Sequence, residues 1–256
     1  TRSTAKQMAP FVKEGQIIVN VAKGVEEDTL MTLSDIISEE IPAANVCVLS
    51  GPSHAEEVGR GLPTTCVVSA AKRETAEYLQ GIFMSPVFRV YTSPDILGIE
   101  LGGALKNVIA LAAGTADGLG YGDNTKAALI TRGIAEIARL GTKMGASQET
   151  FYGLSGMGDL IVTCTSMHSR NRRAGILLGQ GKSVEQTLAE TGGVVEGYYA
   201  AASMHQLAEK TGVEMPICRC VYEILYRQRP VQEVARELMG RARKGEIEDG
   251  WRYPVG

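Results

Sequence analysis

The spacing of hydrophobic positions changes near residue 94, and this change divides the chain into two kinds of predicted structure. Before that point, four short apolar runs rich in Val and Ile show little alternation of polar and apolar residues. Such runs are typical of strands that are covered on both faces of a sheet. We therefore predict strands over residues 16–22, 46–50, 65–69 and 88–91.

Helical patterns lie between these strands and then replace them. Residues 30–41 and 72–84 have apolar positions at helical spacing, and their lengths suit crossovers between parallel strands. After Pro94 the strand pattern stops. The later periodic segments predict helices over residues 100–117, 125–144, 170–179, 194–210, 216–227 and 231–242. The predicted fold class is therefore α/β followed by all-α.

The two patterns also suggest two domains. We assign residues 1–93 to an α/β sheet and residues 94–256 to an all-α part. The chain has no internal repeat and no long linker. We therefore expect the two parts to pack against each other with a cleft between them.

Composition excludes several classes of protein. The 26 Lys and Arg residues nearly balance 29 Asp and Glu residues, which argues against binding to nucleic acid. The longest uncharged apolar stretch, residues 107–116, is shorter than the roughly 20 residues of a membrane span. Five scattered cysteines and three separated histidines match neither a disulfide framework nor a zinc site, so we predict a cytoplasmic protein without a metal.

One lysine interrupts an apolar helix. Residues 101–116 are apolar nearly all round and rich in glycine, yet they contain Lys106 and Asn107. Burial of a lysine without an anion lowers its pKa from about 10.4, so that it can donate or accept a proton near neutral pH. In the alternative interpretation, Lys106 reaches the helix surface and is solvated.

Two loops follow predicted strand ends, where open parallel sheets bind their ligands. Lys23 and Gly24 follow the first strand, and residues 51–57 form a tight turn after the second. This turn can offer free backbone N–H groups to a ligand. A surface lysine and an ordinary strand-to-helix turn are the alternatives.

Further polar residues surround a predicted helix start at residue 170. Ser169 can cap that helix, so that the Arg170 guanidinium, the Asn171 amide and free backbone N–H groups converge on one point. Because Arg binds phosphate in a bidentate manner, this point is a candidate phosphate site. A solvated basic helix start is the alternative.

Two acidic residues follow glycines. Asp159 is expected to orient Lys106 or to hold a substrate hydroxyl, unless it is only a turn residue or helix cap. Glu196 follows a glycine turn at residues 192–193 and can accept hydrogen bonds from a ribose or an amide. A plain loop is the alternative for Glu196.

The glycine fingerprint of a dinucleotide site is missing. Such a site normally has a strand that runs into Gly-x-Gly-x-x-Gly, with an acid about 20 residues later. The glycine groups at residues 118–122 and 156–158 follow no predicted strand. We therefore expect the pyrophosphate half of any nicotinamide site to lie upstream of Thr1, in a longer protein.

The order of the motifs is more specific than any one of them. Along the chain they are Asn20-Val-Ala-Lys23-Gly24, Leu49-Ser-Gly51-Pro52-Ser53-His54-Ala55-Glu56, Lys106-Asn107, Gly156-x-Gly158-Asp159-Leu160, Ser169-Arg170-Asn171 and Val195-Glu196-Gly197. Over essentially its whole length the chain closely resembles the bacterial type of NAD(P)-dependent glycerol-3-phosphate dehydrogenase, without the first βα units of the Rossmann domain. The resemblance implies that residues 1–93 are the C-terminal portion of a dinucleotide-binding, Rossmann-type domain with an incomplete sheet. It implies that residues 94–256 are a helical substrate-binding and catalytic domain like that of 6-phosphogluconate dehydrogenase.

The resemblance also implies roles for individual residues. Lys106 matches the proton donor and acceptor at the C2 oxygen of the substrate. The other implied substrate contacts are Lys23, Gly51, Ser53, Asn107, Asp159, Thr163, Ser169, Arg170 and Asn171. The implied cofactor contacts are Lys23, Ala55, Arg170, Val194 and Glu196.

The implied reaction is reversible hydride transfer between NAD(P)H and dihydroxyacetone phosphate, which yields sn-glycerol 3-phosphate for phospholipid synthesis. The sequence leaves NAD and NADP both open, and it leaves a homodimer open. Two rival interpretations are a related two-domain dehydrogenase of another hydroxyacid or phosphosugar, and a truncated noncatalytic module for dimerisation or binding.

Overall fold

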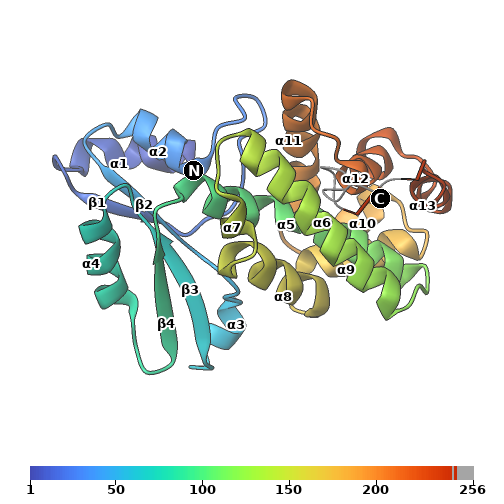
Figure 1. The fold of residues 1–256 in the computed structure, drawn as a ribbon, viewed down its shortest axis with the longest axis horizontal. Helices are drawn as coiled ribbons and strands as arrows, with labels where there is room; N and C mark the ends of the chain where they lie inside the picture. The colour runs from blue at the N-terminus through green and yellow to red at the C-terminus, as the bar shows by residue number, and fades with distance from the viewer. Residues whose placement is uncertain (244, 247–256) are drawn as a thin grey trace, which may run out of the picture.

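The structure, a computed structural model, describes residues 1–243 and 245–246. Its first part is a four-stranded sheet with helices, and its second part is helical (Figure 1). The first part contains α1 (Arg2–Met8), η1 (Ala9–Phe11), β1 (Ile17–Asn20), α2 (Leu33–Glu40), β2 (Asn45–Ser50), α3 (Ala55–Val58), β3 (Thr64–Ser69), α4 (Arg73–Phe83) and β4 (Phe88–Ser93). The predicted fold class is confirmed.

The second part of the chain is built around one long helix. It contains α5 (Ile96–Gly118), α6 (Asp123–Lys143), α7 (Gln148–Phe151), the π-helical turn η2 (Leu154–Gly158), α8 (Asp159–Thr165), α9 (Arg170–Gly179), α10 (Val184–Thr191), α11 (Glu196–Thr211), α12 (Pro216–Arg227) and α13 (Val231–Met239). The sequence pattern missed α7, η2, α8 and α10, because elements this short show too little periodicity. The proposed division at residues 93 and 94 stays a prediction.

The sheet is mixed, not fully parallel. Its strand order is β1-β2-β3-β4, and the β1/β2 and β3/β4 pairs are parallel. The crossovers predicted at residues 30–41 and 72–84 do join parallel strands, through α2 and α4, whereas the β2/β3 pair is antiparallel, with Val48 opposite Ser69. A parallel crossover needs about a dozen residues or more, usually with a full helix, whereas α3 is a single turn.

Only the two central strands are buried along most of their length. On one face, Val68 and Val90 pack with Ala76 and Leu79 of α4. At the sheet edge, Tyr91 of β4 is 49% exposed, so the prediction that all four strands are covered on both faces was wrong for β4. The apolar pattern records burial of the sheet as a whole and does not locate its edges.

Helix α5 is the core of the second part. By length and composition it is apolar enough to cross a membrane, but 83% of its most apolar window is buried inside the protein. The apolar stretch counted in the sequence, residues 107–116, is therefore shorter than the apolar helix itself. The buried Lys106 interrupts the uncharged run without ending the helix. Burial by surrounding helices identifies α5 as a core helix of this fold.

Glycines bring the backbones of α5 and α9 into contact. A Cβ atom on Gly114 would lie 2.1 Å from the carbonyl oxygen of Arg172, and one on Gly175 would lie 2.2 Å from that of Leu111. Side chains at these positions would force the helices apart. This close contact holds the start of α9 against the middle of α5.

Candidate active site

The loop after β1 presents Lys23 to the rest of the site. The Asn20 amide accepts a hydrogen bond from the Ala22 N–H at 3.0 Å and donates one to the Ala22 carbonyl at 3.1 Å. The same amide donates to Oε1 of Glu100 in α5 at 3.3 Å. Asn20 therefore folds the loop tightly and ties it to the core helix, which leaves Lys23 pointing into the space between the two parts.

Lys23 joins three segments of the chain. Its Nζ lies 2.6 Å from Oδ2 of Asp159, at the start of α8, and 3.3 Å from the carbonyl oxygen of Gly51, after β2. The Asp159 side chain is only 2% exposed, so its charge is largely shielded from water. Lys23 therefore contacts both Gly51 and Asp159, and the resemblance implies all three as substrate contacts.

Lys106 lies on the other side of the same carboxylate. Its Nζ forms an ion pair with Oδ1 of Asp159 and donates a hydrogen bond to Oγ1 of Thr163 at 2.7 Å. The Thr163 hydroxyl donates in turn to the Asp159 carbonyl at 2.5 Å, one turn earlier in α8. One carboxylate therefore sits between two ammonium groups, and the interpretation of Lys106 as a solvated surface lysine was wrong.

The environment of Lys106 favours proton exchange near neutral pH. Burial lowers the pKa of its ammonium group, and the nearby charge of Lys23 lowers it further, while Asp159 opposes both effects. The resulting pKa is about 8, compared with 10.5 for a free lysine. A group with this pKa can serve as a general acid or as a general base.

The π-helical turn η2 fixes the start of α8. Inside η2, the Ser155 hydroxyl lies 2.8 Å from the Ser50 hydroxyl oxygen and donates to the Ile99 carbonyl at 2.7 Å. A Cβ atom on Gly156 would lie 2.1 Å from the Phe151 carbonyl oxygen, so this turn needs a glycine. These contacts anchor Asp159 to both the sheet and α5.

Lys23, Lys106 and Asp159 form the lysine cluster. A second group of hydrogen-bonded side chains includes Asn107, the neighbour of Lys106 in the sequence. Asn107 donates to Oε2 of Glu196 at 2.9 Å, and Asn171 donates to Oδ1 of Asn107 at 2.9 Å. The side-chain Oδ1 of Asn171 also accepts the Gly197 N–H at 2.8 Å. Helices α5, α9 and α11 therefore meet at three predicted site residues: Asn107, Asn171 and Glu196.

The start of α9 is built partly as the sequence predicts. The Ser169 hydroxyl accepts the Arg172 N–H at 3.2 Å and so caps the helix. Arg170 is exposed, and its guanidinium lies against Gly193, where a Cβ atom would be 2.9 Å from Nη1. Because Asn171 points into the protein, the convergence of Arg170 and Asn171 on a phosphate stays a prediction.

The remaining predicted residues line the rim of this region. The Ser53 hydroxyl donates to the Gly51 carbonyl at 3.2 Å, and Ala55 is the exposed first residue of α3. Val194 is 57% exposed and directly precedes Val195, the N-cap of α11. Within residues 1–243 and 245–246, the ammonium groups of Lys23 and Lys106 donate to Gly51, Asp159 and Thr163, and not to Ala55 or Val194.

Two residues of the region escaped the sequence analysis. Glu100, buried in α5, accepts hydrogen bonds from the Ser34 N–H at 2.9 Å and from Asn20. Like Lys106, Glu100 is a charged residue inside an apolar helix, so the same sequence feature could have identified it. His54 lies beside the site with its ring 6.2 Å from that of His168, and no sequence spacing predicts this pairing.

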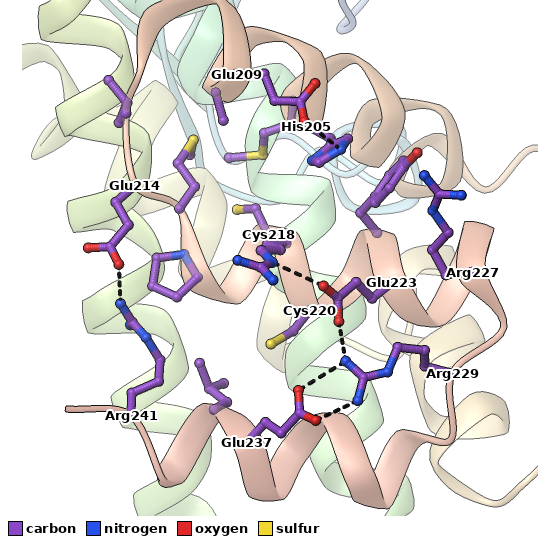
Figure 2. A pocket seen from close by; sticks show the side chains of 18 residues that line it. His205, Glu209, Glu214, Cys218, Cys220, Glu223, Arg227, Arg229, Glu237 and Arg241 are labelled. Atoms are coloured by element: carbon purple, nitrogen blue, oxygen red, sulfur yellow. Dashed lines mark hydrogen bonds and ion pairs between the residues drawn. The ribbon is translucent and has the colours of Figure 1, made fainter.

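A separate cleft of about 670 Å³ lies among α11, α12 and α13 (Figure 2). Its Arg229 is ion-paired with Glu223 at 2.7 Å and with Glu237 at 2.5 Å. None of the described residues that line this cleft is a predicted site residue. In the described part of the chain, no three His, Cys, Asp or Glu residues gather as metal ligands, and a protein without a metal stays a prediction.

Comparisons with known proteins agree with this arrangement. Two family models match: NAD-dependent glycerol-3-phosphate dehydrogenase N-terminus over residues 1–76, and the C-terminus of the same enzyme over residues 95–236. A glycerol-3-phosphate dehydrogenase [NAD(P)+] of Fusobacterium nucleatum is 63% identical over 249 residues, which cover 96% of this chain and 74% of that protein.

Another relative and a solved structure give the same result. A protein of the same name from Agathobacter rectalis is 64% identical over 246 residues, 96% of this chain and 73% of that protein. The crystal structure of glycerol-3-phosphate dehydrogenase from Coxiella burnetii aligns with a TM-score of 0.90 at 37% identity, and the match covers 94% of this chain and 74% of that one.

Proposed function

Because the chain belongs to the family of NAD-dependent glycerol-3-phosphate dehydrogenases, we propose that Lys106 exchanges the proton at the C2 oxygen of the substrate. The protein is an oxidoreductase that interconverts dihydroxyacetone phosphate and sn-glycerol 3-phosphate with NAD or NADP. The observation that carries the proposal is the buried Lys106 ammonium, with a pKa of about 8, beside Asp159 and Thr163.

Substrate is proposed to bind along the line from Lys23 to the start of α9. Lys23 reaches the same carboxylate as Lys106, so a carbonyl oxygen near both ammonium groups would be polarised by two positive charges. Gly51, Ser53, Asp159 and Thr163 surround these lysines through the contacts described above. Ser169, Arg170, Asn107 and Asn171 are proposed to complete the binding site toward the phosphate.

The residues present fit the nicotinamide end of the cofactor. Gly192 and Gly193 both have positive φ angles, of 71° and 76°, and form an open turn under the exposed Arg170 guanidinium. Arg170 offers hydrogen-bond donors, and Glu196 offers acceptors, for a ribose or an amide. We propose Arg170, Val194, Glu196, Ala55 and Lys23 as the cofactor contacts.

The proposed proton path uses the chain's own residues. When bound, the cofactor supplies a hydride to C2 in the reduction or accepts it in the oxidation. In the reduction, protonated Lys106 gives its proton to the C2 oxygen as that oxygen gains negative charge, which leaves the lysine neutral. In the oxidation, neutral Lys106 takes the hydroxyl proton. Asp159 stabilises the charged lysine between these steps and keeps it aimed at the substrate.

The cellular setting is also a proposal. We propose that the enzyme works in the cytoplasm as a homodimer, without nucleic acid or a membrane span, and supplies glycerol 3-phosphate for phospholipid synthesis. All five cysteines are free, which supports a reducing compartment. Cell fractionation and sedimentation equilibrium would test the location and the dimer.

Replacement of Lys106 tests the central proposal. In the protein translated from its complete gene, Lys106→Met should lower kcat for dihydroxyacetone phosphate with NADH or NADPH by roughly 10² to 10⁴. Lys126→Met is the matched control, because Lys126 is 17% exposed and its ion-pair partner is Asp117 instead of Asp159. Full activity of a folded Lys106→Met variant would overturn the assignment.

A further inference from the structure

His54 carries a buried nitrogen without a partner. The residue follows Ser53 and directly precedes α3, and its Nε2 atom is closed off from water, with no hydrogen bond to any described residue. A buried polar nitrogen left unpaired is unfavourable, and such groups in proteins usually await a water, an ion or a ligand. The position of His54 beside two proposed contact residues, Ser53 and Ala55, points to a ligand.

The surroundings of His54 show which part of a ligand could reach it. The ring of His168 lies 6.2 Å away, centre to centre, and His168 directly precedes the Ser169 cap of α9. His54 is also close enough to Lys106 for that ammonium charge to help lower the pKa of the imidazole, after the larger effect of burial. His54 is therefore near both the proton-exchanging lysine and the residue that precedes the Ser169 cap of α9.

The charges that face His54 come from four elements. Lys106 of α5 lowers the pKa of its ring, whereas Asp159 of α8 and two carboxylates of α3, Glu56 and Glu57, raise it. The pKa of the exposed Glu56 is lowered first by a backbone hydrogen bond and then by nearby charges that include Arg170, so a guanidinium lies at this edge beside the α3 carboxylates. A phosphate at this edge can pair with that guanidinium.

We propose that Nε2 of His54 donates a hydrogen bond to the phosphate group of the substrate. The proposal rests on the proposed function, because it assumes that a phosphorylated three-carbon substrate has its C2 oxygen at Lys106. With C2 placed there, the phosphate lies one carbon away, toward the start of α9, which is the side on which His54 faces His168. A neutral imidazole still has one N–H to donate, so the contact does not require a charged ring.

Two substitutions at residue 54 separate this contact from simple packing. His54→Phe keeps a ring of similar shape and removes the donor, whereas His54→Gln keeps an N–H donor at nearly the same reach. His205→Phe is the matched control, because His205 stacks on Tyr222 in the other cleft, with ring centres 3.8 Å apart (Figure 2). All variants are made in the protein translated from its complete gene.

Three measurements define the expected result. His54→Phe should raise KM for dihydroxyacetone phosphate about tenfold, in keeping with the loss of one hydrogen bond to a charged group, with little change in kcat. The inhibition constant of inorganic phosphate, measured in competition with this substrate, should rise by a similar factor. Turnover of unphosphorylated dihydroxyacetone should stay the same, and His54→Gln should recover most of the affinity.

Other outcomes overturn the proposal. An equal loss with dihydroxyacetone and its phosphate would place His54 at the carbonyl, and a change confined to KM for NADH would place it at the cofactor. No change in any of these constants would make His54 a packing residue only. If the unsubstituted protein reduces neither substrate, the proposed function itself fails, and that result is visible before any variant is compared.

Discussion

Two buried carboxylates in different regions of the molecule have opposite kinds of partner. Asp159, between the sheet and the helical part, is 2% exposed and forms ion pairs with Lys23 and Lys106. Glu136, inside the helical part, is 3% exposed and accepts hydrogen bonds from the backbone N–H groups of Ile217 and Cys218 at 2.8 to 3.2 Å. Both residues are acidic and buried, yet one stabilises a helix end and the other belongs to the proposed catalytic site.

Glu136 stabilises a helix end. Helix α12 starts with Pro216, and the next two backbone N–H groups would lack partners without this carboxylate. Burial raises the pKa of Glu136, while its hydrogen bonds from Ile217 and Cys218 oppose that shift. Glu136 also contacts the Cys218 thiol, whose pKa burial raises well above its ordinary value, so this partner stays protonated near neutral pH and the backbone donors do not titrate.

Asp159 instead shares its charge with groups that can change state. Loss of one proton from Lys106, whose pKa is about 8, alters the charge balance of the whole cluster. Insertion of a ligand between the lysines would alter it as well. The comparison indicates that a buried carboxylate paired with titratable side chains belongs to chemistry, whereas one paired with backbone donors belongs to stability.

The largest effect is expected from Asp159→Asn. Without the carboxylate, two ammonium groups face each other with no counter-charge, and the pKa of Lys106 falls further because Asp159 no longer raises it. At pH 7 less of Lys106 is then protonated and its orientation is looser, so kcat/KM for reduction should fall by roughly 10² or more. A steady-state assay with dihydroxyacetone phosphate measures the loss.

Asp159→Glu is the control for this change. It keeps the charge and should retain more activity than Asp159→Asn, with the midpoint of its pH profile closer to that of the unsubstituted enzyme. Equal loss in both variants, with unchanged pH midpoints, would mean that Asp159 has only a packing role and would break the comparison.

A smaller effect is expected from Glu136→Gln, and it should appear in stability alone. The amide keeps one acceptor oxygen for the α12 N–H groups but brings a buried NH₂ group that lacks the charge interaction with the helix end. We expect the free energy of unfolding to fall by about 2 kcal/mol, measured by urea denaturation, with kcat unchanged. Glu209→Gln, at a glutamate 71% exposed, should change stability by less than about 0.5 kcal/mol.

The same contrast explains how much of the fold the sequence could predict. Apolar periodicity located the four strands of the described residues and the long helices. The helices predicted over residues 170–179 and 216–227 have the same bounds as α9 and α12. Strand direction was outside its reach, because the antiparallel β2/β3 pair depends on the short α3 connection. Periodicity indicates which faces of a strand or helix are buried, but it does not indicate the direction of the next strand.

The candidate site was predictable where a charged residue stood in an apolar context. Lys106 was found in this way, and the same reasoning applied to Glu100 would have found the residue that ties the Asn20 loop to α5. His54 was not predictable, because its meeting with His168 depends on two loops more than 100 residues apart in the chain. No local pattern encodes such a contact.

The smallest shift in free energy should be that of the pH profile in Lys23→Met, which accompanies the loss of rate expected when one of the two polarising charges is removed. Lys106 must be protonated for reduction and neutral for oxidation, so log kcat/KM should fall with pH above about 8 in the first direction and rise up to about 8 in the second.

Removal of the Lys23 charge takes away one cause of the lowered pKa and leaves Asp159 to Lys106 alone. Both changes raise the pKa of Lys106, so the midpoint should move upward by about one pH unit, or about 1.4 kcal/mol. Profiles measured between pH 7 and 10 test this, and a downward or absent shift would show that the two lysines do not share the carboxylate.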